Sequence, residues 1–226
     1  QSNYIPWKGY FDIIASVDEF ILYDEVQYTK NDWRNRNVIK TKQGAQWLTI
    51  PVRHTGHFGQ PVDAVRLADA SWIKKHWSSL AQAYAKAPYF EVLAPLVRET
   101  YEACRDEEYL SAVNRRFIMM TAGLLGLTAR ITDSRDYAVA GDRNERLVEL
   151  CRRAGAGQYL SGPAARDYLD ESLFADAGIG LSWMDYSGYP EYPQLHGPFL
   201  HAVSVLDLLF CVGPDKARDF MRPLPR

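Results

Sequence analysis

The sequence predicts an α/β fold in which a mostly parallel sheet carries flanking helices, a β-hairpin, and a helical insert or cap. In the last third of the chain, short apolar runs alternate with stretches of helical periodicity, an order that favours parallel strands with right-handed crossovers. Residues 37–52 have the pattern of two strands around a turn. Residues 71–126 have the pattern of consecutive amphipathic helices. We therefore expect one α/β domain over residues 1–226, with 71–126 as a helical insert or subdomain.

The composition limits the class of protein. With 226 residues, of which 47% are hydrophobic and 24% charged, the chain can bury a sizeable core and matches soluble globular proteins. A formal net charge of −2 argues against a broad nucleic-acid or anionic-membrane surface, and no apolar run is long enough to span a bilayer. Cys104, Cys151 and Cys211 lack the spacing of disulfide pairs or metal ligands. We therefore expect a cytoplasmic protein without nucleic-acid partner, membrane insertion or bound metal.

The first elements are predicted to be a helix and a strand. The helix is indicated by apolar residues at helical spacing, namely Trp7, Tyr10, Phe11, Ile14 and Val17. Pro6 fits its first turn, and Gly9 allows close approach of another backbone or a ligand. The apolar run 20–23 is typical of a short buried strand. A strand before residue 1 would complete a β-loop-helix-β unit, with residues 3–9 at the same sheet edge as Asp24.

The middle of the chain is predicted to hold a hairpin, a short strand and three helices. The strands are expected at residues 37–41, 46–52 and 64–67. The helices are expected at 71–86 with Ser71 as N-cap, at 91–104, and at 107–125 with Gly126 closing the last one.

The last third is predicted to alternate strands and helices. Strands are expected at residues 128–132, 158–162 and 180–185. Asp142 and Glu145 form a capping-box variant that opens a helix ending at Gly155. The apolar residues 204–210 predict a closing helix with Asp207 at its centre. Because a buried carboxylate must be hydrogen-bonded, we expect a structural role for Asp207, with donors from a nearby backbone turn.

The loop from Asp24 to Asn37 is the predicted centre of the protein's function. It follows the buried strand 20–23, so Asp24 falls near a strand's carboxyl end, where open α/β sheets bind ligands. Forked arginines suit carboxylate or phosphate, and the flat aromatic rings suit a ligand ring. A solvated loop whose arginines bridge to its own carboxylates is the alternative. The candidate binding residues of the loop are Gln27, Tyr28, Lys30, Trp33, Arg34, Asn35 and Arg36; Asn3 and Tyr4 are added from the preceding segment.

Further candidates lie at strand ends and in a proline- and aromatic-rich crossing loop, residues 186–201. Polar groups follow three predicted strands, at 132–134, 161–162 and 185–186, although polar residues commonly follow strands. Ser161 from this set, and Tyr192 and Gln194 from the crossing loop, are candidate binding residues.

Asp24 is the first candidate for proton transfer, as a general base or as the group that orients an amine. His196 and His201 are the alternatives, although a lone histidine is more often structural. Cys151 and Cys211 have the setting of inert core cysteines. Cys104 lies near a helix end, where it could be exposed, but a helix C-terminus does not activate a thiolate. A covalent thioester mechanism is therefore not favoured.

Residues 54–57, His-Thr-Gly-His, superficially match the His-x-Gly-His signature of nucleotidyl transferases. That signature requires a strand before it and a helix directly after it, whereas Gly59, Pro61 and a short strand follow here. We interpret the match as coincidental.

Several strings of this sequence are those of a known family. They are residues 1–11, 24–30, 33–37, 47–51, 84–90, 145–147, 159–162, 192–194 and 204–209. In these strings the chain resembles the WbqC-like protein family over essentially its whole length, with Ser2 standing where the family usually has proline after the glutamine. The resemblance implies a role in bacterial surface-polysaccharide or natural-product biosynthesis, such as acylating or aminoacylating an amino sugar. It implies no catalytic residues.

Three functions follow as hypotheses. The first is a transferase in which Lys30, Arg34 and Arg36 hold phosphate or carboxylate while Trp33, Tyr28 or Tyr4 stacks a ring. Its substrate would be a small molecule such as a nucleotide-linked sugar, and acyl-CoA or a carrier protein is the candidate donor; no cofactor is indicated. The second is a nucleotidyl-transferase-like enzyme with Mg²⁺-dependent nucleotide binding, a weak analogy because the usual histidine is Tyr10 here. The third is a non-catalytic binding or scaffold protein of a glycan assembly pathway.

Overall fold

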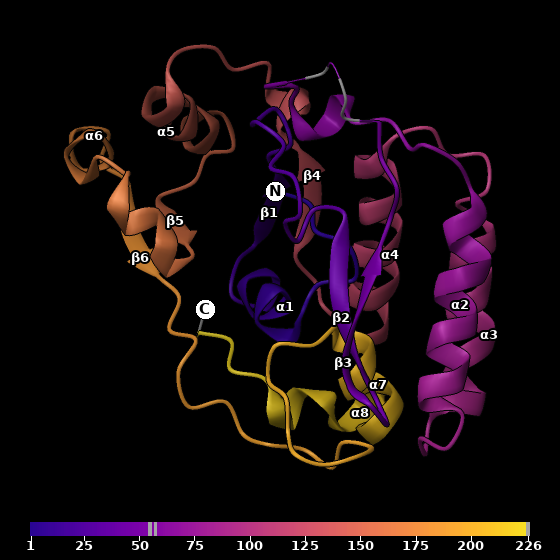
Figure 1. Ribbon diagram of the computed structural model, residues 1–226. Coiled ribbons are helices and arrows are strands. Elements are labelled where there is room, and N and C mark those ends of the chain that lie inside the picture. Colours follow the sequence, from indigo (N-terminus) through magenta and orange to yellow (C-terminus); the bar gives the residue numbers. More distant parts are fainter. Residues whose placement is uncertain (54–55, 57, 225–226) are drawn as a thin grey trace.

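The computed structural model describes residues 1–53, 56 and 58–224, and its helices surround three short two-stranded sheets (Figure 1). The α/β class predicted from the sequence is confirmed. The strands are β1 (Glu19–Leu22), β2 (Arg36–Thr41), β3 (Gly44–Thr49), β4 (Arg130–Asp133), β5 (Gln158–Ser161) and β6 (Gly180–Trp183). The helices are α1 (Lys8–Ala15), α2 (Ser71–Tyr84), α3 (Phe90–Glu102), α4 (Leu110–Leu124), α5 (Arg143–Arg153), α6 (Glu171–Asp176), α7 (Val205–Val212) and α8 (Pro214–Ala217).

The parallel strands form two separate sheets, not the one predicted. β1 pairs with β4, from Glu19 opposite Arg130 to Leu22 opposite Asp133, and β5 pairs with β6. The β5–β6 pair covers its own small apolar cluster around Phe174, which explains why it does not join β1. Figure 1 shows this pair with α5 and α6 on the opposite side of the molecule from α2 and α3. The three polar strand ends predicted to gather at one edge are therefore divided between two sheets.

The hairpin of β2 and β3 is confirmed, and Gly44, the first residue of β3 after the turn, has φ +105°. Residues 64–67, predicted as a strand, differ from that prediction. A 3-10 turn, η1 (Val62–Ala64), comes first, and isolated bridges then join Leu67 to Val52 and Arg66 to Tyr109.

Helix ends follow local chemistry, with one correction. Asp142 accepts hydrogen bonds from the N–H groups of Asn144 and Glu145, so the predicted capping box of α5 is confirmed. Ser71 does not cap α2; instead, the carboxylate of Asp69 accepts the Ser71 N–H at 2.7 Å. None of the helices among the described residues is long and apolar enough to cross a membrane.

The larger apolar core joins the N-terminal segment to α2, α3, α4 and α7. Its largest fully buried side chains include Tyr4, Trp72, Phe117 and Phe210. A second cluster around Phe174 lies under β5 and β6. The description of residues 71–126 as an insert within one domain stays a prediction.

Hydrogen bonds join the segment before α1 to the loop of residues 24–37, which is called the central loop below. Ser2 N–H donates to Asp24 at 2.6 Å, and Tyr4 N–H donates to the Trp33 carbonyl at 3.0 Å. The side-chain amide of Asn37 donates to the carbonyls of Tyr4 and Ile5, both at 3.0 Å. Ile5 is buried with φ +35°. The segment therefore lies along the sheet edge at which Asp24 follows the end of β1.

Candidate functional site

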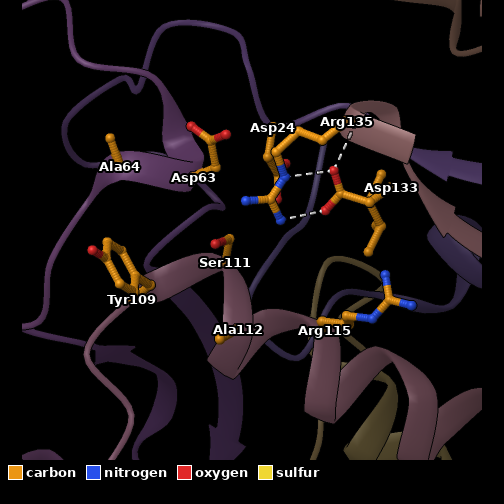
Figure 2. Close-up of a pocket in the computed structure, with 10 residues that line it drawn as sticks. Asp24, Asp63, Ala64, Tyr109, Ser111, Ala112, Arg115, Asp133 and Arg135 are labelled. Carbon is orange, nitrogen blue, oxygen red and sulfur yellow. Dashed lines mark hydrogen bonds and ion pairs between the residues drawn. The ribbon is translucent and has the colours of Figure 1, made fainter. Parts of the chain in front are cut away.

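A cavity of about 550 Å³ lies at the carboxyl ends of the parallel strands β1 and β4 (Figure 2). Leu22 and Asp133, the paired last residues of the two strands, belong to its wall. This is the edge where open α/β sheets bind ligands. The remaining lining residues are Asp24, then Asp63 and Ala64 of η1, Tyr109, Ser111, Ala112 and Arg115 at the start of α4, and Arg135.

Asp24 and Asp63 are neighbours in this wall. Asp24 is 4% exposed, and its carboxylate accepts the Ser2 N–H. Its carbonyl accepts the Asp63 N–H at 3.0 Å, which fixes η1 beside the end of β1. Burial raises the pKa of Asp63; the Arg135 guanidinium opposes this rise, whereas Asp24, Glu25 and Asp133 add to it. Asp63 is thus a carboxyl group with an elevated pKa next to a second carboxylate.

Asp133 and Arg135 form a two-pronged ion pair. Arg135 Nε donates to Asp133 Oδ1 at 2.8 Å and Nη2 donates to Oδ2 at 2.7 Å. Asp133 also caps the 3-10 turn η2 (Ser134–Tyr137) that follows β4. The pair is drawn in Figure 2 and cancels one negative and one positive charge at the cavity wall.

Arg115 is the second arginine of the cavity and comes from α4. Its Nη2 donates to the Ile131 carbonyl at 3.2 Å, so the side chain is tied to β4 while it lines the cavity. Figure 2 shows the Arg135 guanidinium between Asp63 and Asp133, whereas the Arg115 side chain points toward Asp133 and away from Asp63. The arrangement suits a ligand that carries both an amine and an anionic group.

The second half of the central loop forms an exposed aromatic surface with the hairpin. Trp33 and Trp47 are 40% and 46% exposed, and their ring centroids are 5.4 Å apart. The Arg36 guanidinium lies over Trp47 at 4.2 Å. Arg34 pairs with Asp32 at 2.5 Å, as in the alternative interpretation of a loop that satisfies its own charges.

The other candidates of the loop divide between buried and exposed positions. Asn35 is buried and donates to the Ile50 carbonyl at 2.9 Å, and Tyr28 is 8% exposed. Gln27 and Lys30 are exposed, and Gln27 makes an isolated bridge to Pro61.

Tyr4 does not face a ligand. Its side chain is fully buried, and its hydroxyl hydrogen-bonds His76 Nδ1 at 2.8 Å and the Tyr101 hydroxyl at 2.6 Å. The suggestion that Tyr4 stacks a ligand ring is therefore replaced by a core role. Asn3 is half-buried, and its Oδ1 is buried without a hydrogen-bond partner among the described residues.

Tyr192 and Gln194 belong to a buried polar network. Asp207 is fully buried, and its two carboxylate oxygens accept hydrogen bonds from the hydroxyls of Tyr84 at 2.8 Å and Tyr192 at 2.7 Å. Gln194 accepts a hydrogen bond from Lys40 Nζ at 2.7 Å and donates to Tyr192 at 3.1 Å. The donors to Asp207 are thus tyrosine hydroxyls, not the backbone turn expected from the sequence.

The remaining candidates lie away from the cavity. His196 and His201 are exposed in the crossing loop, and the His201 ring packs against Phe199 at 4.6 Å. Ser161 ends β5, in the other parallel sheet. The structure therefore does not bring these residues together with Asp24.

The cysteines are all buried, including Cys104 after the end of α3. Burial raises the pKa of Cys104 to about 12, of Cys151 to about 11 and of Cys211 to about 12. These thiols are poor nucleophiles at neutral pH. Among residues 1–53, 56 and 58–224, no three His, Cys, Asp or Glu side chains are placed to hold a metal ion. Residues 54, 55 and 57 of the His-Thr-Gly-His match lie outside the described residues.

Sequence reasoning reached Asp24 and the strand-end residue Asp133 but missed Asp63, Arg115 and Arg135. For α4 a signal existed. Its core residues Leu110, Val113 and Phe117 leave Ser111, Ala112 and Arg115 on another face, together at helical spacing. For Asp63 no local pattern points to the site, because its position depends on a hydrogen bond to residue 24.

Comparison with known proteins gives one family and one relative. The family model of the WbqC-like protein family matches residues 1–219 of the chain. The chain is 48% identical over 224 residues to a Mycobacterium tuberculosis (strain ATCC 25618 / H37Rv) protein described as "Uncharacterized protein Rv1507c", covering 98% of this chain and 95% of that protein. No solved structure matches the chain. The chain belongs to the WbqC-like protein family.

Proposed function

We propose that this protein is a transferase that acylates or aminoacylates the amine of a small anionic molecule, such as an amino sugar, in bacterial surface-polysaccharide or natural-product biosynthesis. The observation that carries the proposal is the cavity at the ends of β1 and β4, whose wall holds the carboxylates of Asp24 and Asp63 together with Arg115. The net charge of that set favours a cationic amine, and Arg115 supplies a partner for an anionic group of the same molecule.

Asp63 is the proposed general base. Asp24 is almost fully buried and already accepts the Ser2 N–H, so it suits holding the amine in place. Asp63 is half-buried, and its raised pKa brings it closer to neutral pH, where a base is most effective. Arg115 orients the anionic part of the acceptor.

The reaction is a direct transfer from an acyl thioester. The bound ammonium first loses one proton to solvent. The neutral amine nitrogen then attacks the carbonyl carbon, a C–N bond forms, and the C–S bond breaks. Asp63 takes the proton that the nitrogen loses and passes it to the departing thiolate. The carboxylate thus ends the cycle in its starting state, and no protein thiol is needed, in keeping with the burial of all three cysteines.

The exposed surface of Trp33, Trp47 and Arg36 is proposed to bind the base of a nucleotide-linked acceptor. Bases stack on exposed indoles without needing a specific hydrogen-bond pattern. Arg36 adds positive charge beside the rings.

The test is thiol release from acyl-CoA donors in the presence of nucleotide-linked amino sugars, with the amide product identified by mass spectrometry. Asp63→Asn is expected to lower the rate by about 10²–10⁴-fold, the range for loss of a general base. The low-pH limb of the wild-type kcat/KM profile should be absent in this variant. Asp106→Asn, an exposed carboxylate between α3 and α4, is the matched control and should keep the wild-type rate.

A wild-type rate in Asp63→Asn would overturn the assignment of the base. If the wild-type protein binds its ligands but forms no amide with any pair of donor and acceptor, the transferase proposal is overturned in favour of a binding protein.

A further inference from the structure

Two carboxylates of the cavity wall flank one guanidinium, but only one of them is bonded to it. Figure 2 shows the Arg135 guanidinium between Asp63 and Asp133. Asp133 accepts hydrogen bonds from Arg135 Nε at 2.8 Å and from Nη2 at 2.7 Å. Within the described part of the chain, the Asp63 carboxylate accepts no hydrogen bond and forms no ion pair. The guanidinium is thus held on the side of Asp133.

The bond between Arg135 and Asp133 follows from the turn after β4. Oδ1 of Asp133 accepts the main-chain N–H of Arg135 at 3.0 Å as well as its side-chain Nε. The Asp136 carboxylate accepts the Asp133 N–H at 3.1 Å, which completes the capping box of η2. One carboxylate therefore binds both the backbone and the side chain of Arg135, so the cap directs the guanidinium.

Asp63 is fixed independently of this turn, on η1. Its N–H donates to the Asp24 carbonyl, and the Val62 N–H donates to the Val26 carbonyl, both at 3.0 Å. The fold therefore sets the backbone at both carboxylates, and the side chain of Arg135 is the part that can move between them. That side chain is 59% exposed, so packing constrains it little and its bonds to the capping carboxylate decide where it lies.

The two carboxyl groups have opposite pKa shifts. Hydrogen bonds from Arg135 lower the pKa of Asp133. Burial raises the pKa of Asp63, and the guanidinium, which is not bonded to it, opposes this rise only in part. Two acidic groups whose environments push their pKa values apart are typical of acid–base sites.

We propose that Asp133 is a positioning residue: it retains the Arg135 guanidinium and so keeps Asp63 free of an ion pair. The inference rests on the proposed function, because it concerns the group assigned there as the general base. A carboxylate paired with an arginine is a weaker base, and N–H donors occupy its lone pairs. Asp133 thus acts on the reaction through Arg135 and does not need to touch the substrate.

The experiment measures the pKa of Asp63 from the carboxyl ¹³C NMR signals of protein labelled at aspartate, with Asp63→Asn identifying the signal. Asp133→Asn removes the charge but keeps the oxygen that caps η2. Arg135 can then pair with Asp63, whose pKa should fall by about one unit, the lower end of the range for an arginine partner because the guanidinium is exposed. Asp133→Glu keeps a carboxylate for Arg135 and should restore most of the wild-type value.

Loss of charge alone must be separated from release of Arg135. Besides burial, the charges of Glu25 and Asp133 raise the pKa of Asp63, and Glu25 contributes at least as much as Asp133. Glu25 binds the Ser134 hydroxyl at 2.8 Å instead of Arg135, so Glu25→Gln is the matched control. If charge alone acted, this control would lower the pKa of Asp63 as much as Asp133→Asn. We expect the larger fall in Asp133→Asn, and most of that fall should disappear in an Arg135→Gln background.

Equal falls in Asp133→Asn and Glu25→Gln, or an undiminished fall in the Arg135→Gln background, would overturn the inference. Failure of the proposed function has a different signature, because the NMR titration does not require turnover. The expected shifts in a protein that forms no amide overturn the function alone. Amide formation that depends on Asp63, with an unchanged pKa of Asp63 in Asp133→Asn, overturns the role of Asp133 alone. Circular dichroism melting verifies the fold of each variant.

Discussion

Replacing Tyr192 by phenylalanine tests whether Tyr192 is a structural anchor or a substrate-binding residue. Its hydroxyl donates to Asp207 Oδ1 at 2.7 Å inside a network that is closed to solvent. Tyr84 donates to the other carboxylate oxygen at 2.8 Å. Removing one of these hydroxyls leaves the buried carboxylate with an unfilled acceptor site, and it deprives Gln194 of its contact at 3.1 Å.

The expected cost follows from that geometry. A hydrogen bond to a charged group contributes about 1.5–3 kcal/mol, so Tyr192→Phe should lower the free energy of unfolding by about that amount. For a chain of this size, each kcal/mol moves Tm by about 2–4 °C, which gives a decrease of about 3–12 °C.

The loss should also depend on pH. Burial raises the pKa of Asp207, while the hydroxyls of Tyr192 and Tyr84, the amide of Gln194 and the ammonium of Lys40 oppose the rise. Because the folded pKa is above the unfolded one, the contribution of Asp207 to stability is present at low pH. It is lost as the pH rises through the folded pKa. Without the Tyr192 hydroxyl the folded pKa rises further, so the destabilisation of Tyr192→Phe should grow with pH across that window.

The assay is urea unfolding followed by circular dichroism, with Tyr168→Phe as the control because Tyr168 is 43% exposed. The control should stay within about 0.5 kcal/mol of wild type. If Tyr192→Phe is equally silent, or if it weakens ligand binding without loss of stability, the structural assignment is refuted.

Three further predictions concern groups whose environment the structure defines. Burial lowers the pKa of His76 to about 4, so the free energy of unfolding should fall by about 3 kcal/mol from this group as the pH drops from 6.5 toward 4. His76→Gln should remove that part of the fall, measured by urea unfolding at each pH. An unchanged pH profile in this variant would contradict the prediction. The three cysteines should not react with a thiol reagent at pH 8 until guanidinium unfolds the chain; fast modification of the folded protein would disprove their burial. Trp47→Ala should weaken binding of a nucleoside diphosphate by about 5–150-fold, the equivalent of one stacked base. Tyr168→Ala is the matched control, since it removes another exposed ring covered by an arginine, and equal losses in both would argue against the tryptophan surface.

The sequence places Asp24 correctly because the information is local. The apolar run before it predicts a strand, which the structure has as β1 with Leu22 buried at its end, and ligand sites follow such strands in α/β folds. The same reasoning brings Asp133 to the end of β4. The capping box at Asp142 is equally local and is confirmed.

What fails in sequence reasoning is the choice of partners across long distances in the chain. Nothing in the pattern of β5 shows that it pairs with β6 over Phe174 and not with β4. Tyr4 has the composition of a polar loop around it, yet its ring fills the core beside Phe117. Such outcomes depend on how distant side chains fill space, which is a property of the assembled core and not of any window of sequence.

The backbone at Ile5 has a consequence for the cavity. A β-branched residue at φ +35° carries strain of about 1–3 kcal/mol, which persists only where its surroundings impose it. Asn37 supplies that constraint, since its amide grips the carbonyls of Tyr4 and Ile5 while its oxygen accepts the Val38 N–H. Ser2 lies three residues before Ile5, and its N–H donates a hydrogen bond to the Asp24 carboxylate. The hairpin residue Asn37 therefore helps to fix the position of the Asp24 carboxylate through the covalent chain of residues 2–5. Asn37 does so from outside the wall of the cavity, so a ligand bound there would not touch it.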